Sequence, residues 1–125
     1  MRATVSHFEI PAHDLERAAR FYSEVFNWRI DLASWTTPYY KVRGAAGEPP
    51  GREGIDGGLL PAGGGVDHPL LVVHLSGASL EECLERIVEG GGSVDLAPES
   101  VGTMGRFARF RDPEGNLLGL WSSFQ

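Results

Sequence analysis

The chain has 125 residues, of which 42% are hydrophobic and 22% charged, a composition typical of one globular domain with a core of its own. Its formal net charge is −6 and its basic residues are scattered, which argues against nucleic acid or a membrane surface as a partner. The only cysteine, Cys83, excludes an intrachain disulfide. The start of the chain lacks the apolar core of a signal peptide, so we expect a cytoplasmic protein.

Two stretches have the periodicity of amphipathic helices. In residues 13–27, Asp14 can cap a helix whose apolar stripe is formed by Leu15, Ala18, Ala19, Tyr22, Val25 and Phe26. In residues 77–92, Ser79 and Glu82 form a capping box, and the stripe comprises Leu80, Cys83, Leu84, Ile87 and Val88. Three glycines, residues 90–92, end the second helix.

Strand-like runs surround both helices in the same order. Residues 4–11 and 69–76 precede the helices, and residues 28–33 and 92–97 follow them, each of these two ending in "DLA". Further strands are expected at 39–44, 55–61, 105–112 and 115–124. The repeated order indicates an internal duplication of a β-α-β-β-β unit. We expect a loop over residues 44–54 and a joint between the halves at 61–69.

The predicted fold is therefore α+β, with two tandem βαβββ modules in a single domain over residues 1–125. Module one covers about residues 1–62 and module two about 66–125. Neither half is large enough to bury both faces of its own sheet. We expect the two mixed sheets to curve around a shared cleft with the helices outside, and such a cleft is a usual site for a small ligand.

Two motifs carry a resemblance to a known family. "HFEIPAHDLERAARFYSEVFNW" near the start and "FRDPEGNLLGLW" at the end resemble the vicinal-oxygen-chelate superfamily, over essentially the whole chain. This superfamily includes glyoxalase I, extradiol dioxygenases, bleomycin-resistance proteins and fosfomycin-resistance enzymes. "GIDGGLLP" and "MGRFARFRDPEGNLLGLW" are similar to small single-domain glyoxalase-related bacterial proteins. The resemblance implies the fold and a homodimer, because the family pairs its modules within or between chains.

The resemblance also implies four positions for metal ligands. His7 stands at the first of them, and the last strand of module one places the second at about Gly58 or Leu59. The third falls at Val72, or at Leu70 or His74 with a two-residue slip, and the fourth falls at Gly119. Since a catalytic divalent ion needs roughly three protein donors, a metal-free site is the main expectation. Gly119 would then leave floor space in the cleft for a ligand.

An alternative metal site has the composition of a two-histidine, one-carboxylate triad. His7 and Glu9 alternate onto one face of the first strand, and His74 lies on the equivalent face of the repeat. Under this alternative, the protein is a lyase, isomerase or dioxygenase that uses a divalent ion such as Zn, Ni, Fe or Mn. Under the metal-free interpretation, His7 and Glu9 line the site and can act as general bases.

Aromatic residues on strands indicate a binding pocket. Trp121 shares the parity of Gly119, Met104 is an adaptable side chain at the start of a strand, and one of Arg106, Arg109 and Arg111 can serve an acidic group of a substrate. The predicted substrate-binding residues are Trp35, Tyr40, His74, Met104, Phe107, Gly119 and Trp121. We expect a protein that binds a small organic molecule without a catalytic metal. A regulatory or interaction module that binds no ligand is a further alternative.

Overall fold

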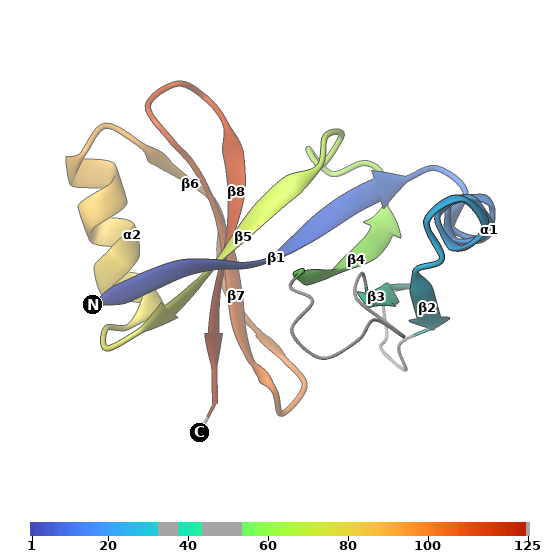
Figure 1. Cartoon of the computed structure of the whole chain (residues 1–125). Coiled ribbons are helices and arrows are strands. Elements are labelled where there is room, and N and C mark those ends of the chain that lie inside the picture. Colours follow the sequence, from blue (N-terminus) through green and yellow to red (C-terminus); the bar gives the residue numbers. More distant parts are fainter. Residues whose placement is uncertain (33–37, 44–53, 125) are drawn as a thin grey trace. The chain divides into compact units, whose positions relative to one another are not determined.

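The computed structural model describes residues 1–32, 38–43 and 54–124 (Figure 1). Trp35 and nearly all of the loop expected over 44–54 lie outside the described residues. The elements in chain order are β1 (Arg2–Ala12), α1 (Leu15–Phe26), β2 (Arg29–Leu32), β3 (Tyr40–Arg43), β4 (Asp56–Pro61), β5 (Leu70–Ser76), α2 (Leu80–Glu89), β6 (Ser93–Val101), β7 (Gly105–Arg111) and β8 (Leu117–Ser123).

The chain forms two compact units. The first unit comprises His7–Pro69, and the second comprises Met1–Ser6 with Leu70–Gln125. Strand β1 therefore contributes to both, since residues 1–6 group with the second unit although the sequence placed them in module one. The shared cleft expected between the modules stays a prediction.

The two units repeat one topology. The strand order is β2-β3-β4-β1 in the first unit and β6-β7-β8-β5 in the second, with the start of β1 next to β5. In each unit one parallel pair, β1 with β4 or β5 with β8, is followed by antiparallel pairs. This repetition confirms the predicted α+β fold built from two βαβββ modules.

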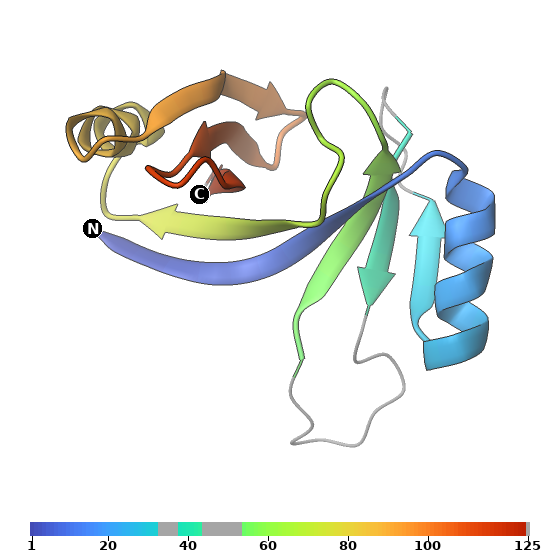
Figure 2. The same ribbon diagram turned by 90° about the horizontal axis from the view of Figure 1, so that it is seen from above.

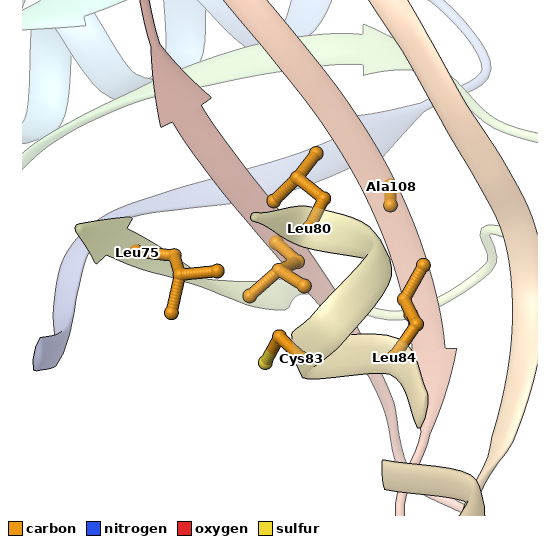
Figure 3. Packing of buried hydrophobic residues seen from close by; sticks show 6 residues of the cluster. Leu75, Leu80, Cys83, Leu84 and Ala108 are labelled. Carbon is orange, nitrogen blue, oxygen red and sulfur yellow. The ribbon is translucent and has the colours of Figure 1, made fainter. Parts of the chain in front are cut away.

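The second unit has the better-packed core. Helix α2 begins where the Ser79 hydroxyl accepts a hydrogen bond from the backbone N–H of Glu82 at 3.0 Å, as the capping box predicted. The helix contacts β6, β7 and β8 (Figure 2). Figure 3 shows the cluster that this packing buries. Its members are Leu75, Leu80, Cys83, Leu84, Ala108 and Leu120.

Helix α1 of the first unit is packed differently. The Asp14 carboxylate caps it by accepting a hydrogen bond from the backbone N–H of Arg17 at 3.0 Å, as predicted. No residue of α1 is fully buried, however, and Val25 and Phe26 of the predicted stripe are each 56% exposed. Their apolar neighbours form an aromatic stack instead, with the Tyr22 and Trp28 ring centroids 5.1 Å apart. The stripe therefore predicted the helix and overestimated its burial.

The turn between β7 and β8 sets the register of the last hairpin. The Asp112 carboxylate accepts hydrogen bonds from the backbone N–H groups of Glu114 and Asn116, both at 2.9 Å, and from the Asn116 side chain. Gly115 adopts a φ of 84°, which favours glycine. The turn pairs Arg109 with Gly119 and Phe107 with Trp121. These four residues lie on the sheet face opposite α2, because Ala108 and Leu120 of the α2 cluster are their neighbours in the strands.

Candidate functional site

A polar face of the first unit is centred on Glu9 of β1. The register places Gly58 of β4 beside Glu9, and Lys41 of β3 beside Gly58 on its other side. His7 lies on the same face of β1 as Glu9, since the two residues are two positions apart in the strand. Glu9 is only 6% exposed, and it is the buried charged residue among those the structure describes. Buried carboxylates are costly unless polar groups stabilise them, so the neighbours of Glu9 define this face.

Tyr39 supplies one of these stabilising groups. Its phenol donates a hydrogen bond to the Glu9 carboxylate, and its ring lies against the backbone of Gly58, where a Cβ would overlap the ring and the hydroxyl. A glycine is therefore required at position 58 for Tyr39 to reach Glu9. Burial, followed by the negative charge of Glu9 and the hydrogen bond to it, raises the pKa of Tyr39 well above its ordinary value. The phenol is thus a proton donor throughout the physiological pH range.

Tyr39 was not among the predicted site residues, whereas Tyr40 was. Tyr40 is in register with Leu59, and strand alternation places both on the face opposite Lys41 and Gly58. Tyr39 lies just before β3, and no sequence period showed which of two adjacent tyrosines faces Glu9. The useful signal was Gly58, because a glycine within a strand often marks the close approach of another group.

A second candidate face belongs to the second unit. Val72 and His74 of β5 are in register with Gly119 and Trp121 of β8, and Phe107 of β7 pairs with Trp121. His74 Nε2 lies 3.2 Å from the Ser123 hydroxyl. The predicted residues His74, Phe107, Gly119 and Trp121 therefore share one sheet face. The parity argument for Trp121 placed it correctly beside Gly119.

The space next to Gly119 is not open, which corrects one expectation. A Cβ built on Gly119 would lie 3.0 Å from Cε2 of Phe107 and 3.1 Å from a methyl carbon of Val72. The Phe107 ring therefore covers the glycine from within the same sheet face. The floor space expected for a ligand is occupied by the chain's own side chains, and the proposed role of Gly119 in substrate binding stays a prediction.

Three other side chains have clear local roles. Met104 is 40% exposed, and its backbone anchors a turn through hydrogen bonds with Val101 and Phe124. Arg106 is paired with Glu81 of α2 at 3.0 and 2.5 Å, on the helix side of the sheet. Burial raises the pKa of the Cys83 thiol, so Cys83 acts as a core residue rather than as a nucleophile.

The positions at which the family resemblance implies metal ligands carry few donor atoms. His7 is in register with Asp56, as Val72 is with Gly119, so the last-strand position of module one falls at Asp56 rather than at Gly58 or Leu59. The first unit thus offers an imidazole and a carboxylate. In the second unit, Gly119 and the candidates Val72 and Leu70 offer no donor atoms, whereas the candidate His74 does, so a metal-free site stays a prediction.

The alternative metal site is the triad of His7, Glu9 and His74. Within residues 1–32, 38–43 and 54–124, no cluster of three or more His, Cys, Asp or Glu side chains is arranged to hold a metal ion. His7 and Glu9 belong to the first unit and His74 belongs to the second. The triad therefore stays a prediction.

In the described part of the chain, neither helix is long and apolar enough to cross a membrane.

Comparison with known proteins agrees with the geometry. The two βαβββ units define a protein of the glyoxalase-like fold class. The family model described as the Glyoxalase/Bleomycin resistance protein/Dioxygenase superfamily matches residues 4–120, and the chain belongs to this superfamily.

Relatives extend the comparison at low identity. A glyoxylase-like domain-containing protein of Didymella fabae is 29% identical over 93% of this chain and 91% of its own length. CFP32 of Mycobacterium tuberculosis is 23% identical over 98% of this chain, which spans only 46% of that protein. The crystal structure of methylmalonyl-CoA epimerase from Mycobacterium tuberculosis matches with a TM-score of 0.65 at 15% identity, covering 96% of this chain and 87% of that one. The structural match supports the fold alone.

Proposed function

We propose that the chain binds a small organic molecule at the polar face around Glu9, without a catalytic metal. The observation that carries this proposal is the buried Glu9 carboxylate with the Tyr39 phenol hydrogen-bonded to it over Gly58. Such a carboxylate attracts ligand groups that donate hydrogen bonds, such as hydroxyls, amides and protonated amines. Few, well-placed polar groups of this kind fix the orientation of small ligands.

The same face suits proton transfer as a secondary activity. Glu9 is a carboxylate that can accept a proton, and the Tyr39 phenol is hydrogen-bonded to it. His7 on the same strand face is a second base. A bound substrate with an acidic C–H next to a carbonyl group is the substrate class that these groups can deprotonate. The reaction class would be a metal-independent isomerase or lyase step.

Ligand screening tests the proposal. A library of small metabolites is screened by thermal shift and by ligand-observed NMR, with chelator-treated protein. We expect hits that bind the wild type and lose at least tenfold in affinity in Glu9→Gln, whereas Glu24→Gln on the exposed surface of α1 is a matched control that leaves affinity unchanged. Hits that bind Glu9→Gln and the wild type equally would refute the site, and a library without hits would favour a module that binds no ligand.

Elemental analysis separates this proposal from the metal-dependent alternative. Protein purified without chelator should contain no stoichiometric Fe, Ni, Mn or Zn. A stoichiometric metal that disappears in His7→Ala would instead support a metal-dependent lyase, isomerase or dioxygenase. His74→Ala shows whether the second unit contributes a ligand to it.

The assembly and location of the protein complete the proposal. We propose a homodimer, as the family resemblance implies, in the cytoplasm, as the sequence predicts. Sedimentation velocity at micromolar concentration should give twice the mass of one chain. A single monomeric species at that concentration would contradict the dimer, and recovery of the tagged protein outside the cytoplasmic fraction would contradict the location.

A further inference from the structure

Arg109 differs from the other two arginines of the motif "RFARFR". Arg106 is bound by the Glu81 carboxylate, and Arg111 contacts Asp95 at 3.8 Å and the Gly115 carbonyl at 3.0 Å. No ion pair joins Arg109 to an acidic group within the described residues, and its Nε is shielded from water without a hydrogen-bond partner. Glu99 of β6 is in register with Phe107 of β7, and no ion pair joins Glu99 to Arg109.

The position of Arg109 is fixed by aromatic packing. Its guanidinium carbon lies 5.2 Å from the centroid of the Phe107 ring, a cation–π contact. Arg109 is in register with Gly119, and Phe107 is in register with Trp121. The guanidinium therefore lies on the face of the second unit that carries Trp121 and His74, and it points away from the α2 core.

An arginine whose Nε–H is shielded and has no hydrogen-bond partner destabilises the folded protein when no anion is bound. Leaving a shielded N–H without an acceptor costs the desolvation energy of that group, and an oxyanion that displaces the shielding atoms and accepts a hydrogen bond from Nε recovers this energy. Carboxylates match the planar guanidinium fork through two parallel hydrogen bonds. The rings of Phe107 and Trp121 provide apolar surface beside the charge, which favours a planar or aromatic body on the ligand.

We propose that Arg109 binds the carboxylate of a small aromatic acid on the Phe107 and Trp121 face of the second unit. This inference goes beyond the proposed function, because it assigns a second binding site, on the other unit, to a different class of ligand. It requires no contribution from Glu9, and the two sites are tested by separate variants.

Matched pairs of acid and amide test the inference. Benzoate and benzamide are titrated into ¹⁵N-labelled protein at concentrations up to the millimolar range, and the Arg109 Nε–H signal and calorimetry report binding. We expect benzoate to bind the wild type at least tenfold more tightly than benzamide and to shift the Arg109 Nε–H signal. Equal binding of the two compounds, or failure of benzoate to bind, would overturn the inference.

Arginine variants locate the effect. In Arg109→Gln the preference for benzoate should disappear, and in Arg109→Lys it should be reduced, because lysine keeps the charge and lacks the fork. Arg86→Gln removes the same charge from the exposed surface of α2 and should leave the preference unchanged. A preference that survives Arg109→Gln in a folded protein would refute the site.

Two further comparisons identify the anion that Arg109 binds and separate this inference from the proposed function. Phenyl phosphate tests whether the anion is a phosphate, and tighter binding of phenyl phosphate than of benzoate would overturn the assignment to a carboxylate. Neutral ligands that depend on Glu9 in the screen, combined with no difference between benzoate and benzamide, would leave the proposed function standing and reject the role of Arg109. If Glu9→Gln does not weaken the binding of the screened ligands and benzoate is still preferred to benzamide, the role of Arg109 stands and the proposed site at Glu9 is rejected.

Discussion

The hydrogen bond between Tyr39 and Glu9 sets the chemistry of the first unit at the scale of single residues. A glycine at position 58 lets the phenol reach the carboxylate, and the burial of Glu9 makes their hydrogen bond energetically important. Inside a protein a polar pair of this kind is stronger than in water, and it is more costly when one partner is removed. We therefore expect the Tyr39–Glu9 hydrogen bond to contribute both to the stability of the fold and to the position of the Glu9 carboxylate in the site.

Removing the phenol should destabilise the protein. Tyr39→Phe leaves a buried carboxylate with one fewer donor, and we expect a loss of about 1–3 kcal/mol in the free energy of unfolding. The loss should shrink in a Glu9→Gln background, because the charge that the phenol stabilises is then absent. Urea denaturation of the four proteins in a double-mutant cycle measures the coupling. Independent, additive effects would contradict a direct Tyr39–Glu9 interaction.

Gly119 provides a second prediction at this scale. Gly119→Glu would place a charged chain where Phe107 and Val72 already lie, so the ring must move and the charge loses water. We expect lower stability, altered Trp121 fluorescence and no stoichiometric binding of Zn, Ni or Fe(II) by calorimetry. Thr103→Glu, at an exposed position of the turn before β7, controls for the added charge. A metal bound by Gly119→Glu that depends on His7 would show that enough of the family's donors remain in place.

At the scale of elements, the Asp112 turn joins β7 to β8 and so determines which residues share the Trp121 face. The side chain and the backbone N–H of Asn116, followed by the N–H of Glu114, lower the pKa of the Asp112 carboxyl. A carboxyl with a depressed folded pKa contributes stability that is present above its unfolded pKa. That stability is lost as the pH falls through the folded pKa.

The turn should therefore weaken on acidification. We expect stability to decrease as the pH falls below the ordinary pKa range of an aspartate, and part of this decrease should be absent in Asp112→Asn. Thermal unfolding across the acidic pH range measures it, with Asp67→Asn as the control, because Asp67 is an exposed carboxylate outside this turn. Equal acid dependence in Asp112→Asn and the wild type would contradict the assignment.

Elements were more predictable from the sequence than contacts. Both helix caps were predicted because they depend on residues close together in the chain. Strand alternation correctly placed Trp121 and Gly119 on one face. The choice of Tyr39 over Tyr40 and the pairing of His7 with Asp56 depend on register between strands far apart in the chain, which no local pattern fixes. The cover of Phe107 over Gly119 depends on the direction of one side chain within the last hairpin.

At the scale of the whole molecule, the two units repeat one topology with unequal packing. Helix α2 buries Leu80, Cys83 and Leu84, whereas α1 buries none of its residues. The difference has a cause in sequence, because α1 directs large aromatic side chains to a stack of their own instead of the interdigitated leucines of α2. Packing of an amphipathic face supplies most of the stability of a helix in a protein.

Native-state hydrogen exchange should therefore separate the units. We expect the amides of α2, β7 and β8 to exchange only by global unfolding, and those of α1 to exchange through local opening at lower free energy. Leu84→Ala should cost about 2–5 kcal/mol and lower protection throughout the second unit, because it leaves a cavity in the α2 cluster. Val25→Ala, at a side chain that is 56% exposed, should cost less than about 1 kcal/mol. Protection of α1 equal to that of α2, together with a large cost for Val25→Ala, would show that the exposed stripe of α1 is buried in solution and that the two helices stabilise the fold equally.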